Sequence, residues 1–377
     1  MKNGAALLAA ALLLSPAADA AGGQDKKGAK RGYGMGLGLF PYEFSIEGVT
    51  ETQKFITSHS DVMSFTVKDG GIPWEPALAD AAFPGGIETK WKEARDGVPA
   101  GCKVFLAITP LNDDKNGLHK NRTEQENQPL PDTFKGKPFD DRSVIKAYAN
   151  YCKRAINAHK PDWVSIAIDC TGPAYDKPRE WEALVRLIRA VREAIKKDNP
   201  RLPVGVTHEL PMLWNQTIAR TVQPSLRDLD FLGLSFMPFV GPLAEKGGGR
   251  SLPTGKEQWL GPLKWVRKYT NLPIAICAAG YTTKDVVVPI YEIKLKGDIV
   301  VQRDFLTGLL EHAEKDDYLF VIWSVPIDLE KLLAGLPSDI QGFLKIIQNV
   351  GLLDGQLKPK PALEVWDREL LRNPKPQ

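Results

Sequence analysis

The sequence has few of the residues that build metal centres or disulfide frameworks. Only four cysteines occur among its 377 residues, and their spacing fits no zinc-binding pattern. Three of the four lie in or beside apolar segments, which favours small buried thiols over disulfides. We therefore expect no bound metal and no cofactor. The cysteines are Cys102, Cys152, Cys170 and Cys277.

An excess of charge of one sign is also absent from most of the chain. The formal net charge is +3, and all of it falls in residues 21–32, where four basic residues accompany one acid. The rest of the chain has no net charge, which argues against a nucleic-acid partner. We expect residues 21–32 to form a basic flexible linker. Its charged residues are Asp25, Lys26, Lys27, Lys30 and Arg31.

The apolar run near the start of the chain is too short to span a membrane. Residues 1–20 combine Lys2, an apolar stretch from Ala5 to Leu14 and the small-residue triplet Ala18-Asp19-Ala20. This pattern predicts a secretory signal peptide that is cleaved after Ala20. We therefore expect a secreted or periplasmic protein without a membrane span.

Familiar catalytic and nucleotide-binding motifs are incomplete. Glycines alternate in the first strand candidate, but Leu39 occupies the third glycine position of a dinucleotide-binding fingerprint. No GxSxG elbow occurs, so a serine hydrolase triad has no support. His208-Glu209 begins like a zinc protease motif, but Met212 replaces the second histidine and Pro211 would disrupt the helix. Glu209 is therefore either a pocket acid or a structural loop residue.

Strand and helix patterns alternate over residues 33–372. Short apolar runs bounded by turn formers predict buried strands, and amphipathic helical patterns lie between them. The chain supplies eight such units, which predicts the α/β class and a single (β/α)8 TIM barrel. The clearest helices are Ser143–His159, Pro178–Lys197, Glu257–Tyr269 and Val301–Lys315. The strand candidates are Tyr33–Phe40, Asp61–Val67, Lys103–Thr109, Trp163–Asp169, Pro203–Thr207, Phe231–Phe236, Pro273–Ala278 and Tyr318–Trp323.

The fourth strand candidate carries the clearest candidate for chemistry. Val164–Ile168 is apolar except for Ser165, as expected of a strand buried on both faces, and it is followed by Asp169 and Cys170. Catalytic groups of such barrels lie at the carboxyl ends of the strands. Asp169 is therefore a candidate catalytic acid.

Aromatic residues and long loops gather at the predicted strand ends. Apolar sugar faces stack on aromatic rings, so the aromatic residues suggest a glycan cleft, with Trp74 and Trp323 as the best candidates. The long loops 111–140, 237–256 and 280–299 suggest an extended substrate. The aromatic residues are Phe40, Tyr42, Trp74, Trp214, Phe236, Phe239, Tyr281 and Trp323.

Several segments in sequence order resemble retaining glycoside hydrolases built on (β/α)8 barrels, especially family 53 endo-β-1,4-galactanases. The resemblance covers most of residues 33–372 and is carried by the combination of segments. These segments are HSDVMSFTVKDGGIPWEPAL, ITPLN, FDDRSVIKAYANYCKRAI, PDWVSIAID, SFMPF, FVIWSVPIDL and GLLDGQLKPKPALEVW.

The resemblance implies two catalytic carboxylates, of which only one has a counterpart here. The family's acid/base is a Glu after the fourth strand, and the matching position is Asp169. The family's nucleophile is a Glu after the seventh strand, and the matching position is Ala278, with Cys277 and Ala279 beside it. The tyrosine that supports the nucleophile corresponds to Phe236. The resemblance thus implies a sugar cleft with a degenerate nucleophile position.

Three functions stay open on these grounds. The first is a pseudoenzyme that binds a polysaccharide or oligosaccharide with little or no retaining hydrolase activity. The second is an active hydrolase, galactanase-like or inverting, in which Asp169 is the acid and a relocated carboxylate such as Glu209 or Asp285 is the base. The third is a non-glycan scaffold of the cell envelope. The candidate substrate-binding residues are Asp69, Trp74, His208, Phe236, Tyr281 and Trp323.

Overall fold

The computed structural model describes residues 30–67, 70–238, 256–288, 293–337 and 341–372. The predicted signal peptide and nearly all of the predicted linker lie outside these residues, and both stay predictions. Asp69, Phe239 and most of the loop 237–256 lie outside them as well.

The central element is an eight-stranded sheet in the order β1-β10-β7-β6-β5-β4-β3-β2. The pairs β1–β10, β10–β7, β3–β4 and β4–β5 are parallel, and Asp61 N donates to Met35 O between β2 and β1. This is the predicted (β/α)8 fold. Its strands are β1 Gly34–Leu37, β2 Val62–Val67, β3 Lys103–Ile108, β4 Trp163–Ser165, β5 Val204–Glu209, β6 Phe231–Phe236, β7 Ile274–Ala279 and β10 Phe320–Trp323.

Helices alternate with these strands, and a short antiparallel hairpin lies between β7 and β10. The hairpin pairs β8 (Val286–Val288) with β9 (Ile293–Leu295). The helices are α1 Ile46–Ser58, α2 Trp74–Ala79, α3 Ile87–Asp96, α4 Arg142–His159, α5 Gly172–Asp176, α6 Pro178–Asp198, α7 Leu210–Leu213, α8 Gln216–Val222, η2 Gln223–Asp228, α10 Lys256–Tyr269, α11 Ile299–Lys315, α12 Glu330–Ala334, α13 Gly342–Ile347 and α14 Pro361–Leu370.

Helix starts follow local capping chemistry. The Asp141 side chain accepts from Ser143 N ahead of α4, and the Asp298 side chain accepts from the first backbone N–H groups of α11. Such caps satisfy N–H groups that have no partner within the helix. Pro178 opens α6, as the sequence predicts, because its missing N–H costs nothing at that position.

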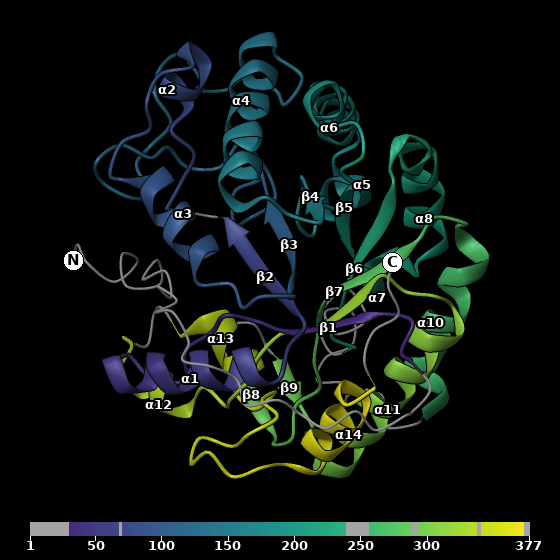
Figure 1. Cartoon of the computed structure of the whole chain (residues 1–377). Helices are drawn as coiled ribbons and strands as arrows, with labels where there is room; N and C mark the ends of the chain where they lie inside the picture. The colour runs from purple at the N-terminus through teal and green to yellow at the C-terminus, as the bar shows by residue number, and fades with distance from the viewer. Residues whose placement is uncertain (1–29, 68–69, 239–255, 289–292, 338–340, 373–377) are drawn as a thin grey trace. The chain divides into compact units, whose positions relative to one another are not determined.

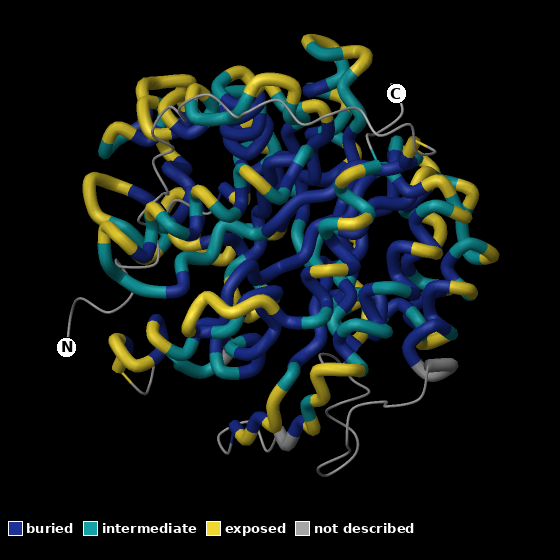
Figure 2. Tube along the Cα trace, turned by 60° about the horizontal axis from the view of Figure 1, so that its bottom comes forward, coloured by how far each residue is buried: buried dark blue, intermediate teal, exposed yellow. Residues whose placement is uncertain are grey.

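The described residues divide into two compact units, each with its own core. The first holds Phe65–His208 and Gln216–Gly233, and in it α4 packs beside α6 (Figure 1). The second holds Glu209–Asn215 together with residues 30–64 and 234–372. Buried residues concentrate in the strands and on one side of the helices (Figure 2).

The first described residues of the second unit are firmly anchored. Arg31 is fully buried, pairs with Asp61 and donates from Nε to the Arg372 carbonyl at 3.2 Å. The two ends of the described chain therefore meet at this arginine.

All four cysteines are unbridged, two of them buried and two half-buried. Across the described ranges, no helix is both long and apolar enough to cross a membrane.

Candidate functional site

The end of β4 departs from regular strand geometry just before Asp169. Thr207 N in β5 donates to Ala167 O at 2.8 Å, and Cys170 N donates to Thr207 O at 3.0 Å. Because Ser165 pairs with Gly205, a regular parallel ladder would use Ile166 O and the N–H of residue 168 instead, so two extra residues are inserted here. Asp169 absorbs this bulge with a left-handed φ of 48°. Bulges re-aim side chains and are common beside active sites.

Side chains hold the β4 carbonyls that precede Asp169. Tyr148 Oη in α4 donates to Ile166 O at 2.8 Å, and Ser165 Oγ donates to Ala167 O at 2.9 Å. Both bonds are buried. The tyrosine supplies the donor that Thr207 N would give to Ile166 O in a regular ladder, and the serine is a second donor to Ala167 O beside Thr207 N. The backbone that leads to the half-buried Asp169 is therefore held by buried hydrogen bonds.

His208 lies in the core of the first unit. It is fully buried, and Thr171 Oγ1 lies 3.1 Å from its Nδ1. Burial lowers the pKa of His208 to about 4, so the ring is neutral at pH 7. Cys170 Sγ lies 3.8 and 3.9 Å from the two ring nitrogens. Because the sulfur is almost equally far from both, it makes no directed thiol–imidazole bond of the kind that activates a nucleophilic cysteine.

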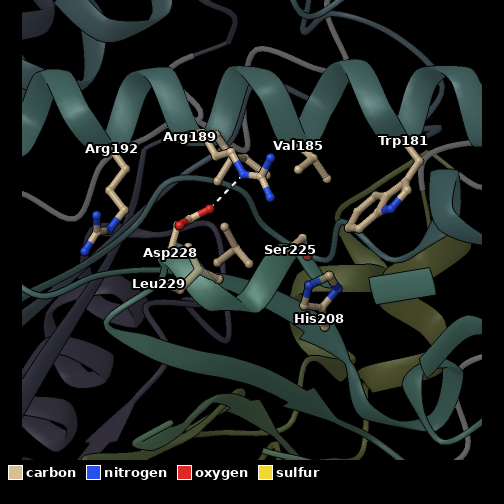
Figure 3. Close-up of a pocket in the computed structure, with 10 residues that line it drawn as sticks. Trp181, Val185, Arg189, Arg192, His208, Ser225, Asp228 and Leu229 are labelled. Carbon is tan, nitrogen blue, oxygen red and sulfur yellow. Dashed lines mark ion pairs between the residues drawn. The ribbon is translucent and has the colours of Figure 1, made fainter. Parts of the chain in front are cut away.

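A cavity beside His208 is too small for a sugar. It lies between α6, β5 and η2 and has a volume of about 10 Å³, room for about one water. Figure 3 shows Trp181 and Arg189 of α6 above His208, with Arg189 paired to Asp228 at 2.7 Å. The imidazole thus faces the α6 side of β5. Its predicted contact with substrate has no support in this geometry and stays a prediction.

Trp74 is covered by the long segment between β3 and α4. It is fully buried, its Nε1 donates to His119 O at 2.9 Å, and Asn121 Oδ1 accepts from its backbone N at 3.3 Å. The Phe134 ring lies 5.2 Å from the indole. No face of this indole is open to a sugar in the described structure. A stacking role would require the covering segment to move.

The aromatic residues at the ends of β6, β7 and β10 form one buried cluster around Phe305 of α11. Their ring centroids lie 5.3 Å (Phe236), 5.5 Å (Tyr281) and 6.2 Å (Trp323) from that of Phe305. All three are at most 1% exposed. Trp323 Nε1 donates to Val350 O at 2.9 Å, and burial raises the pKa of Tyr281 to about 12. These rings therefore fill the core, and their predicted sugar contacts stay predictions.

The end of β7 carries no carboxylate. Ala278 and Cys277 are half-buried there, and Ala279 is buried and pairs with Trp323 in the ladder. Gly280 follows, and a Cβ on it would overlap Val350. The position that matches the nucleophile of the glycoside hydrolases is therefore occupied here by a small apolar side chain at a strand end. Asp285, the alternative base in this loop, accepts from Gly297 N at 2.8 Å at the base of the β8–β9 hairpin.

Glu209, the candidate base, ends β5 and immediately precedes α7. It is half-buried and belongs to the second unit, whereas Asp169 belongs to the first. Within the described part of the chain, no group of three His, Cys, Asp or Glu side chains is arranged to hold a metal ion.

A buried ion pair near β10 escaped the sequence reasoning. Lys360 Nζ lies 2.7 Å from Asp328 Oδ1 and also donates to Thr283 Oγ1 at 3.0 Å. Burial raises the pKa of Asp328 to about 6, although Lys360 opposes this, and burial lowers the pKa of Lys360. Gly351 N donates to the same Asp328 oxygen at 2.9 Å. Part of the signal was available, since Asp328 is the single charge in the largely apolar segment SVPIDL.

Comparisons with known proteins found similarity in structure only. No family model and no curated protein matches the sequence. The exo-β-1,4-mannosidase Op5Man5 from Opitutaceae bacterium strain TAV5 aligns at a TM-score of 0.61 and 14% identity, over 92% of this chain and 60% of its own. The chain thus spans about three fifths of that protein.

Two further solved structures have the same architecture. A variant of GH5_18 from Streptomyces cattleya in complex with Manβ1-4GlcNAc aligns at a TM-score of 0.60 and 13% identity, over 89% of this chain and 80% of its own. A psychrophilic glycoside hydrolase family 10 endo-β-1,4-xylanase aligns at 0.57 and 11%, over 90% and 96%. At these identities the likeness establishes a shared fold. The chain has the (β/α)8 barrel fold of glycoside hydrolases, as its resemblance predicted.

Proposed function

We propose that the chain is an exported, carbohydrate-binding barrel with little or no retaining glycoside hydrolase activity. The observation that carries this proposal is that one of the two expected catalytic carboxylates is present and the other is missing. Asp169 stands at the end of β4, whereas the end of β7 offers Ala278 where a nucleophile is needed. A retaining mechanism requires a carboxylate to attack the anomeric carbon. Its loss removes covalent catalysis and leaves other binding contacts in place.

The backbone of Asp169 supports a functional role for its side chain. A left-handed φ at a residue other than glycine is uncommon, and Asp tolerates it better than most. Glycine would fit that conformation with less strain. The presence of an aspartate at this position supports a role for its carboxylate oxygens, which can accept hydrogen bonds from sugar hydroxyls.

The fold's neighbours and the sequence resemblance support a proposal for the ligand class. The solved neighbours include an exo-β-1,4-mannosidase and a complex with Manβ1-4GlcNAc. We therefore propose β-linked oligosaccharides as ligands, with Manβ1-4GlcNAc, β-1,4-mannan and β-1,4-galactan fragments as the first probes.

Calorimetric titration of these oligosaccharides tests the binding proposal. Asp169→Asn should weaken the wild-type affinity at least tenfold, because it removes a charged acceptor. Asp169→Gly should abolish binding while leaving the free energy of unfolding unchanged or raised by up to about 1 kcal/mol. The matched control is Asp176→Asn, which changes an exposed carboxylate in α5 and should bind like the wild type.

Product assays decide between the proposal and its rivals. If the wild type releases sugar from galactan, arabinogalactan or β-glucan at an ordinary rate of about 1 per second or more, and Asp169→Asn and Glu209→Gln each abolish it, the protein is an active hydrolase. If no oligosaccharide binds and none is cleaved, the non-glycan scaffold is the better description.

A further inference from the structure

The carbonyl immediately before Asp169 is bound by a lysine from a distant loop. Lys115 Nζ donates to Ile168 O at 3.0 Å across 53 residues of sequence. The bulge explains why this carbonyl accepts a side chain. Thr207 N donates to the Ala167 carbonyl, and the two inserted residues move the next carbonyl, that of Ile168, out of register with β5. A carbonyl that leaves the ladder in a partly buried place needs another donor.

A tight turn presents this lysine. Asn112 N donates to Gly117 O and Lys115 N donates to Asn112 O, both at 3.0 Å. The Asn112 and Asn116 side chains close the turn, with Asn116 N donating to Asn112 Oδ1 at 2.9 Å and Asn112 Nδ2 donating to Asn116 Oδ1 at 2.7 Å. Lys115 itself has a φ of 55°, a conformation that Asn or Gly adopts more readily. A lysine at this backbone position is better explained by its side chain than by the turn.

The same turn also touches the chain on the other side of Asp169. A Cβ placed on Gly172 would lie 3.5 Å from the Lys115 Cβ, which is ordinary packing distance. Lys115 therefore contacts the backbone one residue before Asp169 and packs beside the backbone three residues after it. Lys115 is therefore bonded to the segment that carries the carboxylate on one side of Asp169 and lies close to it on the other.

We propose that Lys115 is a positioning residue that keeps the β4 bulge in the conformation that aims Asp169. It acts through the Ile168 carbonyl, so the place of the 112–117 turn and the direction of the carboxylate are coupled. This inference rests on the proposed glycan-binding role of Asp169. It adds that glycan affinity depends on a residue from the segment between β3 and α4.

The test compares Lys115→Asn with Lys115→Arg. Asparagine suits the left-handed backbone but is too short to reach Ile168 O, whereas arginine can still donate to it. Affinity is measured for the oligosaccharide that the wild type binds best. Lys115→Asn should weaken it about tenfold, whereas Lys115→Arg should stay within threefold of the wild-type value. The control is Lys120→Met, which alters an exposed lysine of the same loop and should bind normally.

A double-mutant cycle with Asp169→Asn separates positioning from direct contact. If Lys115 acts through Asp169, Lys115→Asn should cost less than twofold in affinity in the Asp169→Asn background. An undiminished tenfold loss there would overturn the proposal, because Lys115 would then contact the ligand itself.

Hydrogen exchange distinguishes failure of this inference from failure of the proposed function. The amides of Cys170 and Thr207 form the bonds that flank the bulge, and Lys115→Asn should speed their exchange at least fivefold relative to Lys120→Met. This readout needs no ligand, so it holds even if the wild type binds no glycan. Unchanged exchange at both amides would overturn the positioning role.

Discussion

Replacing Lys360 by methionine should expose how strongly the buried ion pair depends on both partners. The side chains of Lys360 and Asp328 are 4% and 0% exposed, and their charged atoms lie 2.7 Å apart. Removing one partner of such a pair strands a charge in the interior and typically costs about 3–5 kcal/mol. We expect a loss of this size in the free energy of unfolding at pH 8.

The loss should depend on pH in a defined direction. Burial raises the pKa of Asp328 from 3.8 to about 6, which corresponds to about 3 kcal/mol of preference for the neutral carboxyl. A group with a raised native pKa contributes stability below pH 3.8 and loses that contribution as the pH rises through 6. Lys360→Met removes the cation that lowers this pKa, so the carboxyl stays neutral to higher pH. At pH 5 we expect a cost of only about 1–2 kcal/mol, from the lost hydrogen bonds.

Guanidinium unfolding followed by tryptophan fluorescence at pH 5 and pH 8 measures both values. The matched control is Lys358→Met, which removes an exposed lysine two residues away and should change stability by less than about 0.5 kcal/mol. Combining Lys360→Met with Asp328→Asn should recover most of the loss at pH 8, because no buried charge then remains. A cost that is equal at both pH values, or equal to that of the control, would refute the reasoning.

Three further tests, one of them with a matched comparison, probe the packing of buried residues. His208→Gln should reduce the loss of stability between pH 6.5 and pH 4 by about 3 kcal/mol in urea titrations, because the unfolded chain otherwise binds a proton that the buried ring refuses until about pH 4. Trp323→Phe should lower the free energy of unfolding by about 1–2 kcal/mol, because it removes one of two donors to Val350 O, leaving only Gln302 Nε2, and leaves space where the larger ring was buried. Gly280→Ala should cost about 1–3 kcal/mol in chemical denaturation, since its Cβ would overlap Val350, whereas Gly172→Ala has ordinary packing room and should cost less.

Much of the fold was predictable because its signals are local. The helix predicted at Glu257–Tyr269 begins within one residue of α10, and the one predicted at Val301–Lys315 ends with α11. Each of the eight predicted strands overlaps an observed one. The fourth strand is shorter than predicted. The regular strand ends at Ser165, and residues 166–169 of the predicted strand form the bulge instead. An apolar run predicts burial, but only pairing with β5 decides where the ladder breaks.

The aromatic residues show that a position near a strand end does not by itself predict contact with a ligand. The sequence predicts Trp74 and Trp323 at strand ends. Trp323 does end β10, whereas Trp74 is the first residue of α2, after β2 has ended at Val67. Whether a ring at a strand end faces solvent or the core depends on what packs against it. Here the segment between β3 and α4 covers Trp74, and Phe305 and the Val350 carbonyl enclose Trp323.

The sequence by itself determined the order of strands and helices and the identity of the residues at each strand end. The missing carboxylate after β7 and the retained Asp169 after β4 follow from it directly. Only the tertiary structure decided that Asp169 has a left-handed backbone, that Lys115 binds the preceding carbonyl, and that Lys360 meets Asp328. These features depend on contacts between segments far apart in the chain, and such contacts leave no local pattern because they form only when the strands come into register.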